Sequence, residues 1–338
     1  MRLAWLKAAT LGALATMLSG CLFAPDIPFE TLEAKYASPA SQFVELRPGL
    51  RVHYRDQGKA DGPPIVLVHG FAASLHAWEP WVAELGPRHR VVTLDLPGFG
   101  LTRTPDGYRM SPDDQVAVVD ALTRRLGVER FALGGNSMGG GVAWRYAMAH
   151  PERLTALILV DAAGAPVAEP AGKKREGPPL VFQLLANPAG RALMRNADPG
   201  LFAAGGLKSA YVDEKLVTPQ LVARYVEMAR APGRREMLTS GGGGDRRGLP
   251  AEAFKAIRTP TLVMHGEADT VIGVEAGRAL AQAIPGARLI TYPGVGHAPM
   301  EQIPQRSAQD VEAFLAAIEN PPPPPLAPAK AGVQAEAK

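Results

Sequence analysis

Short apolar runs alternate with helix-like stretches along most of the chain, and this alternation restricts the fold more than any other feature. The runs are rich in Val, Ile and Leu, and they show no polar alternation. Continuous apolar strands separated by helices indicate a mostly parallel sheet with helices on both faces, which is an α/β fold. The expected strands lie at residues 43–46, 50–54, 65–68, 91–94, 130–133, 157–160, 261–264 and 288–291. The expected helices lie at about 77–85, 112–126, 138–149, 273–283 and 305–318.

The alternation breaks once, over residues 164–250. This stretch has no convincing strand and contains short amphipathic pieces that are interrupted by Pro and Gly. An insertion of this kind between two sheet strands predicts a helical cap. We therefore expect a core built from residues 43–163 and 251–319, with the cap inserted after its sixth strand. Residues 320–338 are rich in Pro and Ala, and we expect a disordered tail there.

The first twenty residues have the pattern of a secretory signal peptide. Arg2 and Lys7 form a short positive region, residues 8–17 are apolar, and small residues follow. The apolar stretch is too short to be a comfortable membrane span. We expect residues 1–20 to be removed from the mature protein.

Cys21 is the single cysteine of the chain. The run Leu18-Ser19-Gly20-Cys21 resembles the bacterial lipobox, and this resemblance implies lipidation of Cys21. Several acyl chains on one residue give stable anchoring, so residues 21–42 are expected to hold a lipid-anchored cysteine and a tether in the bacterial cell envelope. The residue after the cysteine is Leu22 and not Asp, which would favour the inner membrane. By resemblance to lipoprotein sorting in Gram-negative cells, Leu22 implies the periplasmic face of the outer membrane. The alternative is an ordinary signal peptide followed by a chance cysteine.

The overall composition excludes some partners. A net charge of +3 gives no indication of nucleic acid binding, and a single cysteine excludes a cysteine-based zinc site. The sequence gives no sign of a metal or an organic cofactor, and it does not reveal the oligomeric state.

A G-x-S-x-G pentapeptide, Gly135-Asn136-Ser137-Met138-Gly139, lies between an expected strand and an expected helix. In that context the outer glycines permit a tight turn, which strains the serine backbone and exposes its hydroxyl above a sheet edge. The motif alone also arises by chance in a chain with 36 glycines. Ser137 is therefore a candidate nucleophile whose assignment depends on suitable partners.

A serine nucleophile needs a base and a group that orients the base. His297 follows the last expected strand in a glycine-rich loop, at the end where parallel sheets place ligands. Asp269 follows the strand 261–264, and the order Ser137, Asp269, His297 is that of nucleophile, acid and base. Asp161, after the preceding strand, is the runner-up for the acid. Two further carboxylates near strand ends are Asp95 and Glu267.

The oxyanion of a tetrahedral intermediate needs hydrogen-bond donors. One candidate is the backbone N–H of Met138, at the helix start just after the nucleophile. The other is the N–H of Phe71, in the loop that follows the strand 65–68. His69 in that loop is expected to have a structural role.

Taken together, these motifs resemble the α/β-hydrolase superfamily, in its capped, esterase- or lipase-like branch with a serine triad. They occur in the family's order over about residues 43–318. The resemblance implies an eight-stranded sheet whose second strand is antiparallel, with a cap after strand six. The motifs are His69-Gly70-Phe71, Asp95-Leu96-Pro97-Gly98-Phe99-Gly100, Gly135-Asn136-Ser137-Met138-Gly139, His265-Gly266-Glu267-Ala268-Asp269 and Gly296-His297.

Carboxylic ester hydrolysis through an acyl-enzyme on Ser137 is the function that we expect, with a small-molecule ester as substrate. Classes of this fold with an aspartate nucleophile are disfavoured because residue 137 is Ser. Hydrolases that cleave carbon–carbon bonds of ring-cleavage products have a similar nucleophile motif, but typically carry Trp where this chain has Ala298. Perhydrolases and an anchored, non-enzymatic binding protein are further alternatives.

Apolar residues of the cap are candidates for lining the substrate pocket, although such residues more often pack a cap onto its core. An apolar cap suits a lipid-like ester. The candidates are Leu180, Leu184, Leu185, Met194, Leu201 and Met228.

Overall fold

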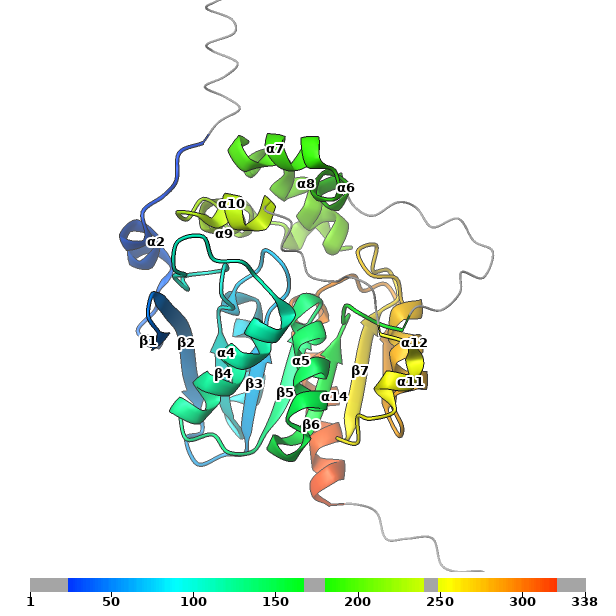
Figure 1. Cartoon of the computed structure of the whole chain (residues 1–338). Coiled ribbons are helices and arrows are strands. Elements are labelled where there is room, and N and C mark those ends of the chain that lie inside the picture. Colours follow the sequence, from blue (N-terminus) through cyan, green and yellow to red (C-terminus); the bar gives the residue numbers. More distant parts are fainter. Residues whose placement is uncertain (1–23, 167–179, 240–248, 321–338) are drawn as a thin grey trace, which may run out of the picture.

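The computed structural model describes residues 24–166, 180–239 and 249–320 (Figure 1). Within them an eight-stranded sheet has the order β1-β2-β4-β3-β5-β6-β7-β8. Strand β2 runs antiparallel to β1 and β4, whereas the remaining pairs are parallel, which confirms the predicted fold class. The strands are β1 (Ser41–Arg47), β2 (Leu50–Gly58), β3 (Pro64–Val68), β4 (Arg90–Leu94), β5 (Phe131–Asn136), β6 (Leu154–Val160), β7 (Thr261–Gly266) and β8 (Arg288–Tyr292).

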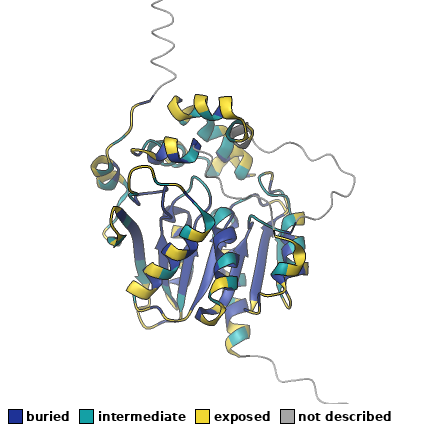
Figure 2. Cartoon of the chain, viewed as in Figure 1, coloured by how far each residue is buried: buried dark blue, intermediate teal, exposed yellow. Residues whose placement is uncertain are grey.

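Helices cover both faces of the sheet, and two hydrophobic cores result. Alternate residues of β3 show the division. Val66 and Val68 pack with α4 (Pro112–Arg125) and α5 (Met138–Ala149), whereas Ile65 and Leu67 pack with α3 (Glu79–Leu85) and α14 (Pro304–Glu319). The strands are buried between helices whose outer faces are exposed (Figure 2). The helical elements of the core are η1 (Leu75–Trp78), α3 (Glu79–Leu85), α4 (Pro112–Arg125), α5 (Met138–Ala149), η2 (Pro151–Arg153), α11 (Ala251–Phe254), α12 (Glu275–Ala283), α13 (Pro299–Gln302) and α14 (Pro304–Glu319).

Local signals explain where the helices begin and end, and α4 is an example. The Ser111 side chain accepts a hydrogen bond from the N–H of Asp114, so it caps the first turn. Acidic residues occupy that turn, and Arg124 and Arg125 occupy the last turn, so both ends complement the helix dipole.

The cap lies over the edge where the parallel strands have their carboxyl ends (Figure 1). It is inserted between β6 and β7, as predicted, and its described part is helical. Every strand-end loop that carries a candidate site residue therefore faces the cap. The helical elements of the cap are α6 (Leu180–Ala186), α7 (Pro188–Asn196), α8 (Gly200–Ala210), η3 (Glu214–Leu216), α9 (Pro219–Ala229) and α10 (Arg234–Thr239).

The segment that was predicted to be a tether is bound to the cap along its described part. The N–H of Ile27 donates to the carbonyl of Arg230 over 2.7 Å, and Asp26 forms a 2.6 Å ion pair with Arg235. Helix α2 (Phe29–Tyr36) buries Leu32 against Met228 of α9. The pattern of residues 21–42 did not reveal this docking. The signal peptide, Cys21 and residues 321–338 lie outside the described residues.

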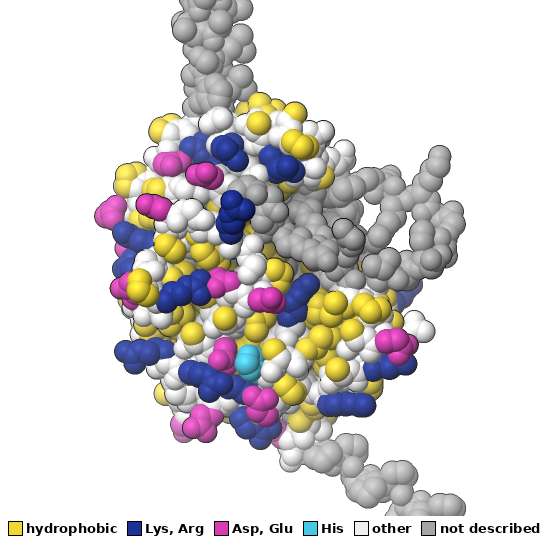
Figure 3. Space-filling view, viewed as in Figure 1, with side chains coloured by type: hydrophobic (Ala, Val, Ile, Leu, Met, Phe, Trp, Pro, Cys, Tyr) yellow, Lys and Arg dark blue, Asp and Glu magenta, His cyan; other side chains and the backbone are white. Residues whose placement is uncertain are grey.

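The exposed face in Figure 3 carries basic and acidic side chains interspersed among apolar ones. No helix among the described residues is long and apolar enough to cross a membrane.

The start of α5 approaches β3 so closely that only glycine fits there. A Cβ on Gly139 would lie 2.1 Å from the carbonyl oxygen of Val68. We expect Gly139→Ala to lower the free energy of unfolding by about 1–3 kcal/mol, because α5 must shift away from the sheet. Gly205→Ala in α8 is the control, since its Cβ meets open space, and it should leave stability unchanged or raise it by up to about 1 kcal/mol. Urea unfolding measures both, and equal midpoints would contradict the close approach.

Candidate active site

Ser137 occupies a strained turn between β5 and α5. Its φ of 54° lies in the left-handed region, which is uncommon for a residue with a side chain. A Cβ on Gly135 would lie 2.2 Å from the carbonyl oxygen of Gly139, so the turn tolerates no side chain there. The sequence predicted this turn, and the strain holds the Ser137 hydroxyl at the sheet edge.

Asp269 and His297 are brought together from the ends of β7 and β8. The Nδ1–H of His297 donates to Oδ2 of Asp269 over 2.6 Å. The other oxygen of Asp269 accepts the N–H groups of Val271 and Ile272, over 2.7 and 3.0 Å. The carboxylate is therefore fixed in orientation, and it directs Nε2 of His297 away from itself.

The electrostatic environment of this pair favours an ion pair. Burial disfavours the charged ring of His297, but the charge and hydrogen bond of Asp269 outweigh it and raise the pKa of His297 above its usual value. Burial opposes ionisation of Asp269 as well, yet His297 and His265 hold the pKa of that carboxyl below its usual range. Asp269 is thus an anion at neutral pH, as the orienting member of a triad must be.

Asp161, the runner-up for the acid, lies beside the pair without a hydrogen bond to His297. Its Oδ1 accepts the N–H of Gly266 over 2.9 Å, and its Oδ2 has no partner among the described residues. Burial raises the pKa of Asp161 to about 7. The geometry therefore favours Asp269 over Asp161 as the partner of the histidine.

Asp161, Asp269 and His297 also form a group whose potential metal-ligand atoms all lie within 4.8 Å of one another. Two carboxylates and an imidazole can bind a divalent cation. In this chain, however, Nδ1 of His297 already donates its hydrogen to Asp269, so the nitrogen nearest the carboxylate is protonated. The arrangement fits a hydrogen-bonded triad better than a metal centre.

Asn136 has a positioning role that the sequence did not indicate. Its side-chain amide donates to the carbonyl of His297 over 3.0 Å and to that of Val160 over 3.3 Å. The backbone N–H of His297 in turn donates to the carbonyl of Ala210 in the cap, over 2.8 Å. The loop after β8 is therefore held both by the serine turn and by the cap. An amide residue next to the nucleophile was the only available signal.

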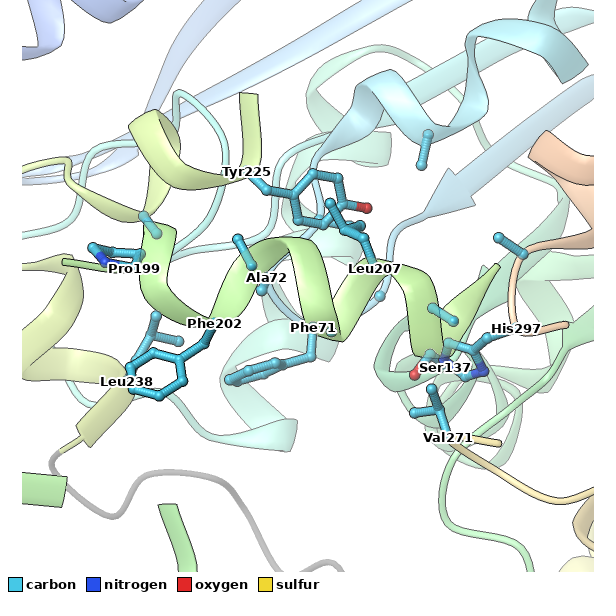
Figure 4. Close-up of a pocket in the computed structure, with 18 of the residues that line it drawn as sticks. Phe71, Ala72, Ser137, Pro199, Phe202, Leu207, Tyr225, Leu238, Val271 and His297 are labelled. Atoms are coloured by element: carbon cyan, nitrogen blue, oxygen red, sulfur yellow. The ribbon is translucent and has the colours of Figure 1, made fainter. Parts of the chain in front are cut away.

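The two candidate oxyanion donors flank Ser137. Met138 is the first residue of α5, so its N–H is free of the helical ladder. Gly70, the residue before Phe71, is close enough to the serine turn that a Cβ on it would lie 3.1 Å from Cβ of Ser137, and Phe71 and Ser137 line the same cavity. Among the described residues, no hydrogen bond joins Oγ of Ser137 to His297, although the two side chains are adjacent (Figure 4). Such bonds often tighten only when substrate is bound.

His69 has the structural role that was predicted for it. Its Nδ1–H donates to the carbonyl of Gly70 over 2.7 Å, and its Nε2 accepts the N–H of Leu96 over 3.0 Å. Burial lowers the pKa of His69, so the neutral ring with these two bonds is the stable form.

A second row of serine, histidine and aspartate side chains joins β1, β2 and the end of β4. His53 contacts Asp95 through Nδ1 over 2.6 Å and Ser41 through Nε2 over 2.8 Å. Oγ of Ser41 also accepts the N–H of Ser38 over 3.0 Å and Nε–H of Arg55 over 3.2 Å. Both lone pairs of Ser41 are occupied, so this row ties β1 to β2 and β4 instead of activating a nucleophile.

A cavity of about 230 Å³ opens above Ser137 and is lined mainly by apolar side chains. Ser137 and His297 lie at one end, and Phe202, Pro199 and Leu238 lie at the other (Figure 4). Of the cap residues proposed from the sequence, Leu185 and Met194 line it. The candidates Leu184, Leu201 and Met228 do not belong to its lining, while the side chain of Leu180 lies outside the described part. Met228 packs against Leu32, and Leu201 is exposed.

Comparison with known proteins identifies the family. A family model described as alpha/beta hydrolase fold matches residues 63–303, so the chain belongs to the α/β-hydrolase family. It is 31% identical to 2-hydroxymuconate semialdehyde hydrolase of Pseudomonas sp. (strain CF600) over 300 residues, which cover 84% of this chain and 97% of that relative. It is 26% identical to Lipase 1 of Psychrobacter immobilis over 281 residues, 82% of this chain and 84% of the lipase. The crystal structure of a membrane phospholipase A matches with a TM-score of 0.69 and 28% identity, covering 94% of this chain and 97% of that one. The relatives are hydrolases, and family membership makes this chain a hydrolase.

The pKa of His297 tests which carboxylate is its partner. Asp269→Asn is expected to lower this pKa, because it removes the negative charge that stabilises the protonated ring. Asp161→Asn should lower it less, because burial leaves Asp161 partly protonated near neutral pH. An NMR titration of the imidazole measures both shifts, and a larger shift for Asp161→Asn would reverse the assignment.

Proposed function

We propose that this chain hydrolyses carboxylic esters through an acyl-enzyme on Ser137. The observation that carries the proposal is the Asp269–His297 hydrogen bond, which lies beside a strained serine at one end of an apolar cavity. A neutral acyl chain fits such a lining because its burial is favourable and leaves no polar group without a partner.

In the proposed reaction, Oγ of Ser137 attacks the ester carbonyl carbon while its proton moves to Nε2 of His297. The resulting oxyanion accepts hydrogen bonds from the N–H groups of Phe71 and Met138. The bond to the leaving oxygen then breaks, and the alcohol takes the proton from His297. A water molecule repeats the sequence on the acyl-enzyme, which releases the carboxylic acid and restores Ser137. Asp269 holds the ring tautomer throughout.

The alternative is hydrolysis of a carbon–carbon bond in a ring-cleavage product, which the semialdehyde hydrolase supports at 31% identity. A muconate-type substrate carries a carboxylate, which requires an available cation in the site. Among the described residues, the one arginine in the cavity lining is Arg235, and it is already paired with Asp26 over 2.6 Å. Ala298 also occupies the position after the histidine where those enzymes typically carry Trp. Both features favour a neutral ester.

Kinetics on p-nitrophenyl esters test the proposal. Ser137→Ala should reduce kcat by on the order of 10⁶-fold and abolish labelling by a fluorophosphonate probe. Ser41→Ala is the matched control, because its hydroxyl also contacts a histidine paired with an aspartate, and it should retain labelling. Since the pKa of His297 is raised, kcat/KM of the wild type should fall as pH drops through a value above about 6.5, where the base becomes protonated. Activity on a 2-hydroxy-6-oxo-dienoate without activity on any ester would favour the alternative.

We also propose that Cys21 is lipidated and anchors the chain in the cell envelope. Only two residues separate it from Ala24, the first described residue, and the next residues bind the cap through Asp26 and Ile27. The three Cα–Cα steps from Cys21 to Ala24 span about 11 Å at most, so an anchor at Cys21 would keep the cap close to the membrane surface.

Expression in a bacterial host with labelled palmitate tests the anchor. The wild-type chain should incorporate label and sediment with the membranes, whereas Cys21→Ser should lose the label because it lacks the acylated sulfur. Esterase activity of Cys21→Ser should be unchanged, which confirms folding. Unlabelled wild-type protein in the soluble fraction would refute the anchor.

A further inference from the structure

Besides the catalytic residues, a cluster of polar side chains interrupts the apolar lining of the cavity. Tyr211, Tyr225 and Glu301 contribute to the wall, and Arg224 lies behind Glu301. The Glu301 side chain is 13% exposed. Burying a carboxyl group in an apolar cavity is costly unless partners satisfy it, so this cluster needs an explanation.

The cluster satisfies only part of its own hydrogen-bonding capacity. The hydroxyl of Tyr211 donates to Oε2 of Glu301 over 2.5 Å. The nearest guanidinium nitrogen of Arg224 lies 4.0 Å from Oε1, which is beyond hydrogen-bond distance, and Oε1 accepts no hydrogen bond from the described residues. Nε of Arg224 is buried without a partner among them. One carboxyl oxygen at the cavity wall therefore remains available to a ligand.

The protonation state of the cluster suits a neutral polar ligand. Burial raises the pKa of Glu301 to about 7, opposed by the Tyr211 hydrogen bond and the charge of Arg224, while the charge of Glu79 adds to the rise. Burial also raises the pKa of Tyr211 well above its usual value, so its hydroxyl keeps its proton. Near neutral pH the carboxyl group can thus accept or donate a hydrogen bond, and it does not require a cationic partner.

The position of the cluster indicates which half of a bound ester it would contact, the alcohol half or the acyl half. Glu301 lies in α13, four residues after His297, and Tyr211 follows Ala210, whose carbonyl accepts the N–H of His297. The cluster therefore lies on the histidine side of Ser137. Because the histidine protonates the leaving oxygen, the alcohol half of an ester lies on that side. The acyl half is left with the apolar end near Phe202 and Leu238 (Figure 4).

We infer that Glu301 and Tyr211 bind hydroxyl groups on the alcohol half of the substrate, and that the substrates are partial esters of a polyol, such as a monoacylglycerol. The inference rests on the proposed ester hydrolysis at Ser137. A buried site that hydrogen-bonds a substrate hydroxyl discriminates strongly against an analogue that lacks it, because the polar groups of the site then stay unpaired.

Glyceryl and n-propyl esters of one fatty acid provide the test, since they differ by two hydroxyl groups on the same three-carbon alcohol. We expect the full-length chain to show a kcat/KM at least tenfold higher on the glyceryl ester. Glu301→Gln and Tyr211→Phe should each reduce this preference to below about threefold, while kcat/KM on the propyl ester changes by less than about threefold. Met194→Ala is the control from the apolar end, and it should alter both rates equally and keep the preference.

The outcomes separate this inference from the proposed function. Activity on both esters without a preference in the wild type would overturn the alcohol subsite and leave ester hydrolysis intact. Equal losses on both esters in Glu301→Gln and Tyr211→Phe would show a structural role, which also overturns it. Absence of activity on either ester, together with absence of fluorophosphonate labelling, would overturn ester hydrolysis itself.

Discussion

The close approach between the start of α5 and the end of β3 is the constraint on which the site depends. Glycines at 139 and 140 leave no side chain between the helix and its neighbours, with a Cβ on Gly140 only 2.4 Å from that of Ala162. Because the helix begins so near the sheet, Ser137 is forced into a left-handed conformation directly above it. The strain in one residue is therefore maintained by packing along the whole first turn of the helix.

Much of the fold and the main site residues could be predicted because both follow the same rule. Apolar runs identify the parallel strands, and reactive side chains follow these strands at their carboxyl ends. Ser137, Asp269 and His297 were each found in this way. The same rule ranked Asp269 first but left Asp161 as an alternative, since Asp161 follows β6 directly and Asp269 comes three residues after β7. Only the 2.6 Å contact of His297 with Asp269, which depends on how the loops fold back, distinguishes them.

Contacts between distant segments left no periodic signal and could not be predicted. The amide of Asn136 reaches the loop after β8, and Tyr211 of the cap meets Glu301 of the core, yet neither pair has a recognisable spacing. The apolar character of the cap residues was evident, but the direction in which each side chain points was not. Met228 packs against Leu32 of α2 because the amino-terminal segment covers α9, and a sequence read as a tether gave no reason to expect that surface to be occupied.

The row formed by Ser41, His53 and Asp95 has a consequence for how hydrolase sites are recognised. Its two hydrogen bonds, 2.6 and 2.8 Å long, meet the distance criteria by which a search for catalytic triads selects candidates. What differs is the serine oxygen, which already receives hydrogens from Ser38 and Arg55. A template that requires both bonds would therefore return this false site, whereas the Ser137 site shows only the bond between His297 and Asp269 among the described residues. Counting the donors that point at the serine oxygen removes the false match without any knowledge of substrate.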